Sequence, residues 1–235
     1  MMKNHLLKIT LLKERFPTNN YYPFCLPLIS KTRELKFNNP VTIFVGENGS
    51  GKSTLLEAIA LACGVYIWSD PAVTRVVRNK YEKQLSRYVI PHWRNGKVPG
   101  AFFGAETFKD FTYYLEEWAS SDPALLDYFG GKSLLTQSHG QSMMSYFRSR
   151  YQLKGIYFLD EPETALSPKT QLELMKIIKE NSQAGHAQFV MATHSPILLA
   201  CNNATIYNFN EIPVNKIAYK ETEHYQVYKE FLTSR

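Results

Sequence analysis

The segment of residues 46–53 constrains the fold more than any other part of this 235-residue chain. It reads GENGSGKS, which fits the pattern G-x-x-x-x-G-K-[ST], and it joins the apolar, β-branched run 41–45 to the helix-forming run 51–61. A glycine-rich turn between a strand that is buried on both faces and a helix is typical of parallel sheets covered by helices. The segment therefore predicts an α/β fold.

The same segment has the chemistry of a phosphate-binding loop. Successive backbone N–H groups and the positive end of the following helix attract an anion, and the glycines let the backbone curl around it. We expect Lys52 to reach the β- and γ-phosphates of ATP and the Ser53 hydroxyl to bind Mg²⁺. The residues predicted to bind ATP here are Gly46, Glu47, Asn48, Gly49, Ser50, Gly51, Lys52, Ser53 and Thr54.

Two adjacent carboxylates follow a second apolar run. Asp160 and Glu161 come directly after residues 156–159, which have the pattern of a buried strand. Functional side chains of parallel sheets gather at these carboxyl ends. We expect Asp160 to complete the Mg²⁺ site and Glu161 to polarise the attacking water as a general base.

A histidine stands just past a third apolar run, residues 188–192. A lone histidine is more often structural than catalytic, and only this position raises His194 to a candidate. We expect His194 to contact the γ-phosphate or to orient the water.

The rest of the pattern predicts one domain over residues 1–235. Residues 6–12 and 35–37 resemble outer strands, 204–207 and 216–219 resemble a closing pair, and Ser167 with Pro168 begins a helix. Residues 69–129 are the least regular part. We expect a mostly parallel sheet with flanking helices, antiparallel outer strands, and a small helical lateral subdomain (69–150) inserted between cores 1–68 and 151–235.

Composition argues for a cytoplasmic protein. The longest apolar run, residues 58–68, falls short of the roughly 20 residues that a spanning helix needs. Three cysteines far apart in the chain (Cys25, Cys63 and Cys201) suit free thiols in a reducing compartment. We expect such a chain to reach a membrane only through a partner.

The basic charge is concentrated in one segment. Residues 75–97 carry seven Lys and Arg side chains and one acid, which accounts for the whole net charge of +6. Tyr81, Tyr88 and Trp93 are interleaved with them. A mixture of cations and aromatic rings is typical of surfaces that follow phosphates and stack on bases, although it also occurs on solvated faces. The candidate nucleic-acid contacts are Arg75, Arg78, Lys80, Lys83 and Arg87.

The order of these motifs resembles the ATP-binding cassette (ABC-type) P-loop ATPases. The phosphate-binding loop (Walker A), a Ser138–Gln141 segment, Asp160-Glu161-Pro162 (Walker B) and His194 follow one another as they do in that family. The resemblance is strongest to the soluble branch of structural-maintenance-of-chromosomes and RecF-type proteins, and to small stand-alone bacterial predicted ATPases.

The resemblance also implies residue roles. Ser138, Gly140 and Gln141 match the family's Ser-Gly-Gly-Gln signature, which opens a helix and binds the γ-phosphate held by the opposite subunit; His139 departs from it. Residues 165–167 match the dimer-contacting loop, and Glu106 is the candidate for the Mg²⁺-sensing position. The candidates for adenine stacking are Tyr21, Tyr22 and Phe37.

The resemblance implies an ATP-dependent homodimer that hydrolyses ATP and works with an unidentified protein partner. With 86 residues between Lys52 and Ser138 and no sustained heptads, a long coiled-coil arm is excluded. Two classes stay open: a soluble engine acting on nucleic acid in repair or defence, which the basic segment favours, and the ATP-binding subunit of a membrane transporter. For Thr222–Tyr225, a His-Tyr pair that packs a C-terminal helix is the commoner outcome.

Overall fold

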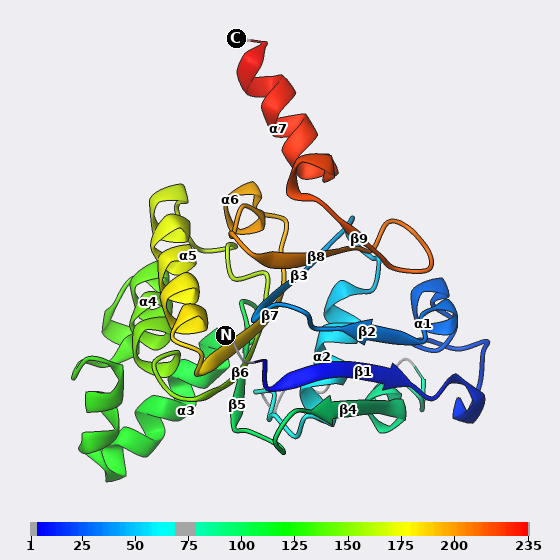
Figure 1. Cartoon of the computed structure of the whole chain (residues 1–235). Coiled ribbons are helices and arrows are strands. Elements are labelled where there is room, and N and C mark those ends of the chain that lie inside the picture. The colour runs from blue at the N-terminus through cyan, green and yellow to red at the C-terminus, as the bar shows by residue number, and fades with distance from the viewer. Residues whose placement is uncertain (1–3, 69–78, 235) are drawn as a thin grey trace.

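A six-stranded main sheet carries the predicted site. A computed structural model describes residues 4–68 and 79–234. The strands of this sheet are β3 (Val41–Val45), β5 (Gly100–Gly104), β6 (Gly155–Asp160), β7 (Ala187–Ala192), β8 (Ala204–Asn208) and β9 (Asn215–Ile217). They lie in the order β5-β6-β7-β3-β8-β9, and every neighbouring pair is parallel except β8 and β9 (Figure 1).

A smaller antiparallel sheet lies beside the main sheet. It contains β1 (Leu6–Leu11), β2 (Glu34–Lys36) and β4 (Val89–Trp93) in the order β2-β1-β4. The buried side chain of Gln188, on β7, ties the two sheets together. Its oxygen accepts from the backbone N–H groups of His5 and Leu6, both at 2.8 Å, and its nitrogen donates to the Leu6 carbonyl at 2.9 Å.

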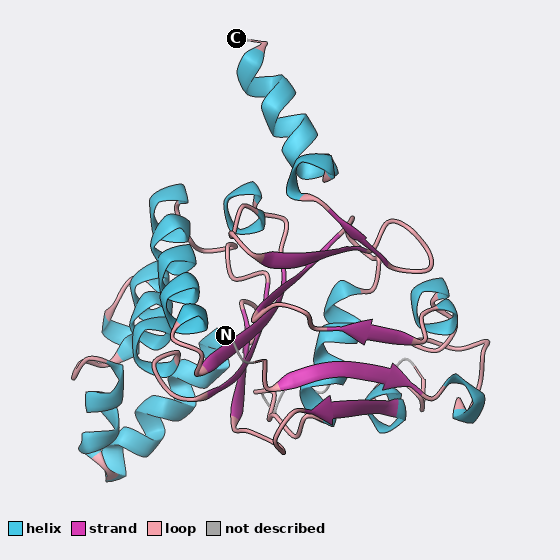
Figure 2. Cartoon of the chain, in the orientation of Figure 1, coloured by secondary structure: helices cyan, strands magenta, loops and turns pink. Residues whose placement is uncertain are grey.

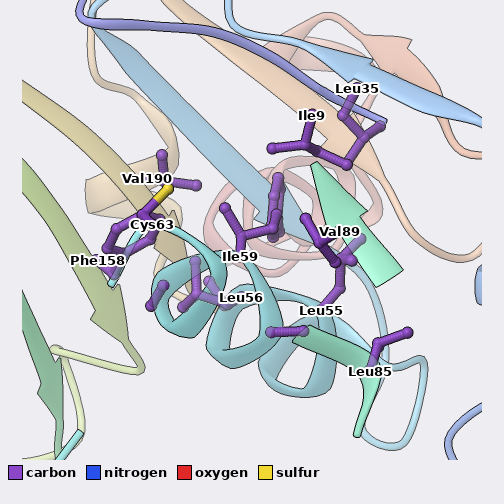
Figure 3. Close-up of a cluster of buried hydrophobic side chains, with 14 of the residues drawn as sticks. Ile9, Leu35, Leu55, Leu56, Ile59, Cys63, Leu85, Val89, Phe158 and Val190 are labelled. Atoms are coloured by element: carbon purple, nitrogen blue, oxygen red, sulfur yellow. The ribbon is translucent and has the colours of Figure 1, made fainter. Parts of the chain in front are cut away.

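Helix α2 (Lys52–Ala62) packs between the two sheets. Leu56, Ile59 and the following Cys63 lie in one apolar cluster with Phe158 and Val190 of the main sheet (Figure 3). Ile9 and Leu35 of the small sheet belong to the same cluster, together with Leu55, Leu85 and Val89. Because both faces of α2 are covered, the helix is apolar almost all round, which explains the run of hydrophobic residues in 55–62.

Four helices cover the opposite face of the main sheet. They are α3 (Phe108–Ser121), α4 (His139–Arg150), α5 (Pro168–Gln183) and α6 (Pro196–Leu199). Successive side chains of a strand point to opposite faces, so Phe44 joins the cluster around α2 while Ile43 and Val45 join the cluster under these four helices. All five residues of β3 are buried, which produces its uninterrupted apolar sequence.

The remaining elements are short or peripheral. They are α1 (Pro27–Lys31), α7 (Glu223–Thr233) and 3₁₀ turns at Lys13–Arg15, Leu85–Tyr88, Pro123–Phe129, Leu134–Thr136 and Tyr219–Glu221. Helix α7 projects away from the body of the molecule, and none of its residues is buried (Figure 2). In the part of the chain that the structure describes, no helix has the length and apolar character needed to cross a membrane.

The predicted α/β class with a parallel-dominated sheet and flanking helices is confirmed. The closing pair is confirmed too, although β9 ends at Ile217 because Tyr219 begins a 3₁₀ turn. The range 69–150 contributes to more than one part of the fold: β4 joins the small sheet, β5 joins the main sheet, and α3 and α4 cover one face. The limits of a lateral subdomain stay a prediction.

Candidate functional site

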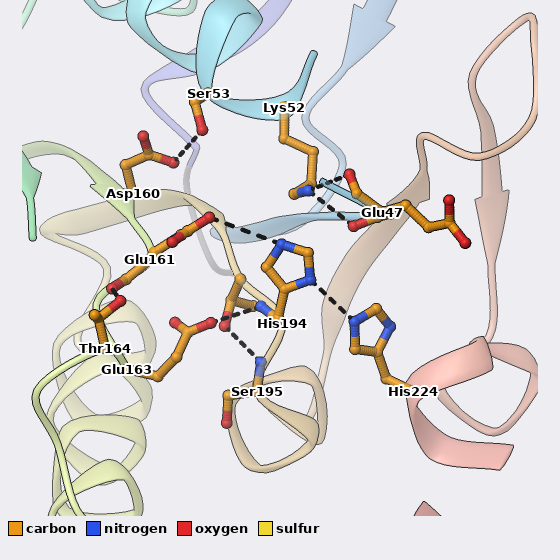
Figure 4. A network of polar contacts seen from close by, with 12 residues as sticks. Glu47, Lys52, Ser53, Asp160, Glu161, Glu163, Thr164, His194, Ser195 and His224 are labelled. Atoms are coloured by element: carbon orange, nitrogen blue, oxygen red, sulfur yellow. Dashed lines mark hydrogen bonds and ion pairs between the residues drawn. The ribbon is translucent and has the colours of Figure 1, made fainter. Parts of the chain in front are cut away.

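The three predicted motifs meet at the carboxyl edge of the main sheet. Strands β6, β7 and β3 are neighbours, so the residues that follow their last positions come together although they are far apart in the chain. Figure 4 shows Lys52 and Ser53 after β3, Asp160 and Glu161 at the end of β6, and His194 after β7. The topology therefore gathers all the catalytic candidates.

The phosphate-binding loop requires glycine where it enters α2. Gly51 is the N-cap of α2 with φ of +92°, in the left-handed region, and an added Cβ would lie 2.8 Å from a methyl group of Leu28. The loop is also held from outside, because the side-chain oxygen of Asn210 accepts from the backbone N–H of Glu47 at 2.7 Å. Asn210 was not expected from the sequence, since it lies 163 residues from Glu47.

Lys52 is held by the loop itself. Its ammonium donates to the carbonyls of Gly46 and Glu47, both at 2.8 Å, and the side chain is almost fully buried. Burial lowers the pKa of Lys52, while the nearby carboxylates of Glu161 and Asp160 act in the opposite direction. A buried cation that faces two carboxylates and an anion-binding loop is suited to neutralise phosphate charge.

Ser53 and Asp160 form the oxygen pair expected of a Mg²⁺ site. The Ser53 hydroxyl donates to Oδ1 of Asp160 at 2.9 Å, across 107 residues of sequence. Burial raises the pKa of Asp160 to about 7, against the effect of this hydrogen bond. A hydroxyl and a buried carboxylate at one point are hard oxygen donors, the type that Mg²⁺ prefers. The donor set therefore fits this ion.

Glu161 has an unusual backbone conformation. Its φ is +47°, in the left-handed region that non-glycine residues rarely occupy, and its N–H donates to the carbonyl of Ala192 at 2.9 Å. Such strain is often found at functional sites, where the surrounding structure holds it. The turn lets Glu161 follow Asp160 at the strand end and face His194, whose Nε2 lies 3.8 Å from Glu161 Oε1.

His194 is held from two sides. Its backbone N–H donates to Glu163 Oε1 at 2.6 Å, and its Nδ1 lies 3.2 Å from Nε2 of His224, at the start of α7. Burial lowers the pKa of His194 to about 4, and the charge of Lys52 adds to this effect. Its Nε2 is buried without a hydrogen-bond partner, as is the hydroxyl of Ser50 in the phosphate-binding loop. Both atoms therefore have hydrogen-bonding capacity that the described residues do not use.

The signature residues lie elsewhere on the molecule. Ser138 is the N-cap of α4, and its backbone N–H donates to Gln141 Oε1 at 3.1 Å. An added Cβ at Gly140 would lie 3.1 Å from the carbonyl of Ala165, so the signature meets the predicted dimer-contacting loop. Helix α4 and helix α2 cover opposite faces of the main sheet. The sheet therefore lies between Ser138, at the start of α4, and Lys52, at the start of α2.

Glu106 and the candidates for adenine stacking lie in different surroundings. Glu106 is exposed two residues after β5, whose last residue, Gly104, pairs with Asp160. Tyr22 is next to the site, with its hydroxyl 2.9 Å from that of Thr54 at the start of α2. The expectation for Phe37 is wrong: this ring is only 2% exposed because it packs in the core between the sheets.

The basic segment is exposed, but its aromatic rings are not free. Arg75 and Arg78 lie outside the described residues, whereas Lys80, Lys83 and Arg87 are exposed. Tyr81 and Tyr88 pack edge-on against Phe24, and Trp93 packs against the same core. Hydrophobic packing of the small sheet uses part of each ring, and the rings are only partly buried, so a base-stacking surface stays a prediction.

Comparisons with known proteins agree with this geometry. Residues 19–83 match the family described as "AAA domain", and residues 143–200 match "AAA domain, putative AbiEii toxin, Type IV TA system". Petrobactin import ATP-binding protein FpuD of Bacillus anthracis is 25% identical over 178 residues, which cover 70% of this chain and 65% of FpuD. The probable siderophore transport system ATP-binding protein YusV of Bacillus subtilis (strain 168) is 25% identical over 182 residues, covering 70% and 64%.

Solved structures show the same fold. A metal-chelate type ABC transporter in an inward-facing conformation aligns with a TM-score of 0.55 at 17% identity over 96% of this chain and 88% of that one. The structure of cbiO1 from Clostridium perfringens, part of the ABC transporter complex cbiONQ, aligns with a TM-score of 0.51 at 18% identity over 98% and 96%.

These findings support an ABC-type P-loop ATPase domain. One family match contains the phosphate-binding loop, and the other contains Asp160 and His194. The main sheet brings these two regions of the sequence together. The chain spans slightly less than two thirds of the length of FpuD and YusV, and the activities of these complete proteins are not assigned to it.

Proposed function

We propose that this ABC-type domain binds ATP with Mg²⁺ and hydrolyses it. The observation that carries the proposal is the 2.9 Å contact between the Ser53 hydroxyl and Asp160, beside the buried ammonium of Lys52. An oxygen pair suited to a metal ion and a cation suited to phosphate, both beside the N-terminus of α2, support the proposal. Phosphoryl transfer depends mostly on such positioning and charge stabilisation.

Each candidate residue has a role in this reaction. The loop N–H groups and Lys52 hold the phosphates, while Ser53 and Asp160, with Glu106 at the neighbouring strand end, would hold Mg²⁺. Bound Mg²⁺ supplies charge neutralisation at the β- and γ-phosphates. Glu161 accepts the proton of the attacking water, and His194 presents Nε2 to the γ-phosphate. Tyr22 is the candidate for contact with adenine.

The proposed working unit is an ATP-dependent homodimer. Ser138 and Gln141 are exposed at the N-terminus of α4, a helix of twelve residues whose positive end suits an anion. Since α4 and α2 cover opposite faces of one sheet, the signature reaches a phosphate most directly on a second copy. ATP held between two copies would stabilise the closed form by mass action.

Replacement of Lys52 tests nucleotide binding. We expect Lys52→Ala to reduce ATP affinity by at least about tenfold, because a buried cation opposite the phosphates is lost. Isothermal calorimetry with Mg-ATP measures this, and Lys36→Ala, at an exposed lysine of β2, is the matched control. Unchanged affinity in Lys52→Ala would contradict the proposed site.

Two biological settings have specific support. The exposed cations Lys80, Lys83 and Arg87 favour a cytoplasmic engine that acts on nucleic acid in repair or defence. The likeness to FpuD and YusV, an import and a probable siderophore transport ATP-binding protein, favours the ATP-binding subunit of a membrane transporter. In either setting ATP hydrolysis is coupled to a conformational change in a separate protein partner.

Salt-dependent binding separates these settings. If the protein acts on nucleic acid, the triple variant with glutamine at positions 80, 83 and 87 should bind DNA or RNA more weakly than the wild type. The slope of the logarithm of its binding constant against the logarithm of the salt concentration should flatten by up to about 0.9 per lost phosphate contact. The charge-matched control replaces Lys169, Lys176 and Lys179 on α5 with glutamine. Absence of wild-type binding at low salt, together with co-purification of a membrane permease, would favour the second setting.

A further inference from the structure

Two histidines face each other beside the proposed γ-phosphate position. Nδ1 of His194 lies 3.2 Å from Nε2 of His224, with ring centroids 5.3 Å apart (Figure 4). The contact joins the loop after β7 to the first turn of α7, across 30 residues of sequence. Nothing in the proposed hydrolysis so far uses His224.

The first turn of α7 is held firmly, although the rest of the helix projects into solvent. Thr222 is its N-cap, only 1% exposed, and the Thr222 hydroxyl accepts from the N–H of Tyr225 and donates to the carbonyl of Tyr219. Glu223 accepts from the side-chain nitrogen of Asn210 at 3.3 Å, and Asn210 also holds the phosphate-binding loop. His224 therefore has a fixed position relative to the site.

The surroundings favour the neutral form of both imidazoles. Burial lowers the pKa of His194 and of His224, and the charge of Lys52 adds to both effects. Each neutral ring carries one N–H, and only one of these two protons lies in the hydrogen bond that joins the rings. Either His224 donates and His194 carries its proton on Nε2, or His194 donates through Nδ1 and leaves Nε2 bare.

The surroundings favour the first arrangement. His194 Nε2 lies 3.8 Å from a carboxylate oxygen of Glu161, and it is buried without another partner. A bare nitrogen there would place a lone pair against the carboxylate and, in the proposed complex, against an anionic phosphate oxygen. A protonated Nε2 is attracted to both groups.

We propose that His224 is a positioning residue, whose Nε2–H donates a hydrogen bond to Nδ1 of His194. This hydrogen bond fixes the orientation and the tautomer of His194, so that His194 presents its own Nε2–H to the γ-phosphate. This inference rests on the proposed function and extends it to a residue of α7. Partners of this kind fix the tautomer of functional histidines in metal sites and in hydrolases.

The experiment combines kinetics with ring ¹⁵N spectra. His224→Phe keeps a planar ring without a donor, His224→Gln restores an N–H donor, and His186→Phe removes a 3.2 Å contact to Asn181 at the opposite end of β7 as the matched control. Long-range ¹H–¹⁵N spectra distinguish protonated from bare ring nitrogens, and His194→Gln assigns the His194 signals among six histidines.

We expect His224→Phe to lower kcat for ATP on the order of tenfold, with KM changed less than about twofold, as for other partners that orient a histidine. His224→Gln should recover most of the rate, and His186→Phe should match the wild type. In the nucleotide-free wild type, His194 should carry its proton on Nε2, and His224→Phe should add the other tautomer.

A wild-type rate in His224→Phe, or a His194 proton on Nδ1 in the wild type, would overturn the proposal. If His224→Phe does not fold, the wild-type spectrum and the His224→Gln rate decide the question. If the wild type hydrolyses no ATP, the proposed function fails, while the ring spectra still show whether His224 sets the tautomer of His194.

Discussion

Asp160 is a carboxylate in surroundings that suit a cation. Its one hydrogen bond, from Ser53, does not offset its burial, and its pKa is raised to about 7. The folded chain without metal therefore holds a charge that costs free energy above neutral pH. Function explains this cost, because a buried carboxylate binds a divalent ion more strongly than a solvated one.

Asp160→Asn should stabilise the metal-free protein while it removes hydrolysis. The folded pKa of Asp160 exceeds the unfolded one, so its ionisation destabilises the fold progressively as pH rises from about 4 to about 7, by at most about 4 kcal/mol. We expect a Tm gain of about 3 to 6 °C at pH 8 in EDTA, which corresponds to 1 to 2 kcal/mol, and little gain near pH 4. Calorimetry at both pH values measures this; an equal gain at both would contradict the burial argument.

At the scale of elements, two helices that begin with Ser-Pro, the short α6 and the longer α5, lie beside the site. Ser195 caps α6, and its hydroxyl accepts from Ile197 and Leu198 and donates to Gln171 at 2.6 Å. Gln171 in turn donates to the carbonyl of Leu166 at 2.9 Å. This chain of bonds connects the residue after His194 with the loop that meets the signature helix.

Comparison of two serine caps tests this connection. Ser195→Ala should lower the free energy of unfolding by about 2 to 3 kcal/mol, because it removes a buried cap and takes away the hydrogen bond that Ser195 donates to Oε1 of the half-buried Gln171. Ser167→Ala removes an exposed cap of the longer helix α5 and should cost about 1 kcal/mol. Urea unfolding measures both, and equal losses would show that the bond to Gln171 contributes nothing.

The sequence was sufficient to predict the strands that are buried on both faces. Residues 41–45, 156–159 and 188–192 were predicted as strands because a central parallel strand is apolar throughout, and the motifs followed from their ends. It was insufficient for β5, a five-residue strand that begins and ends with glycine, and for α3, which lies in the region that appeared irregular. It also missed Asn210 and the pairing of His224 with His194, because contacts across long sequence separations leave no local pattern.

At the scale of the whole molecule, the proposed homodimer would use two incomplete halves of a site from each copy. The phosphate-binding side lies with α2 on one face of the sheet, and the signature lies at the exposed start of α4 on the other. This arrangement explains why a monomer would bind ATP and a dimer would be needed to enclose it.

Glu161→Gln should trap the proposed dimer. The amide keeps the side-chain shape but accepts no proton, so hydrolysis should fall by about 10²–10⁴-fold while binding survives. Sedimentation with Mg-ATP should then show a dimer. Adding Ser138→Arg should restore the monomer without changing monomer affinity, whereas adding Gln152→Arg, at the other end of α4, should leave the dimer intact. A Glu161→Gln protein that stays monomeric at high concentration would contradict the sandwich.

The position of β3 between β7 and β8 determines when the ATP site comes into existence during translation. The loop after β3 leaves the ribosome early, but its flanking strands end at Ala192 and Asn208, and Asn210 is synthesised later still. Domains are made from the N-terminus onward. A nascent chain that stops before β7 therefore carries the complete glycine-rich sequence without a frame to hold it, and nucleotide can act on this loop only after Asn210 has been made.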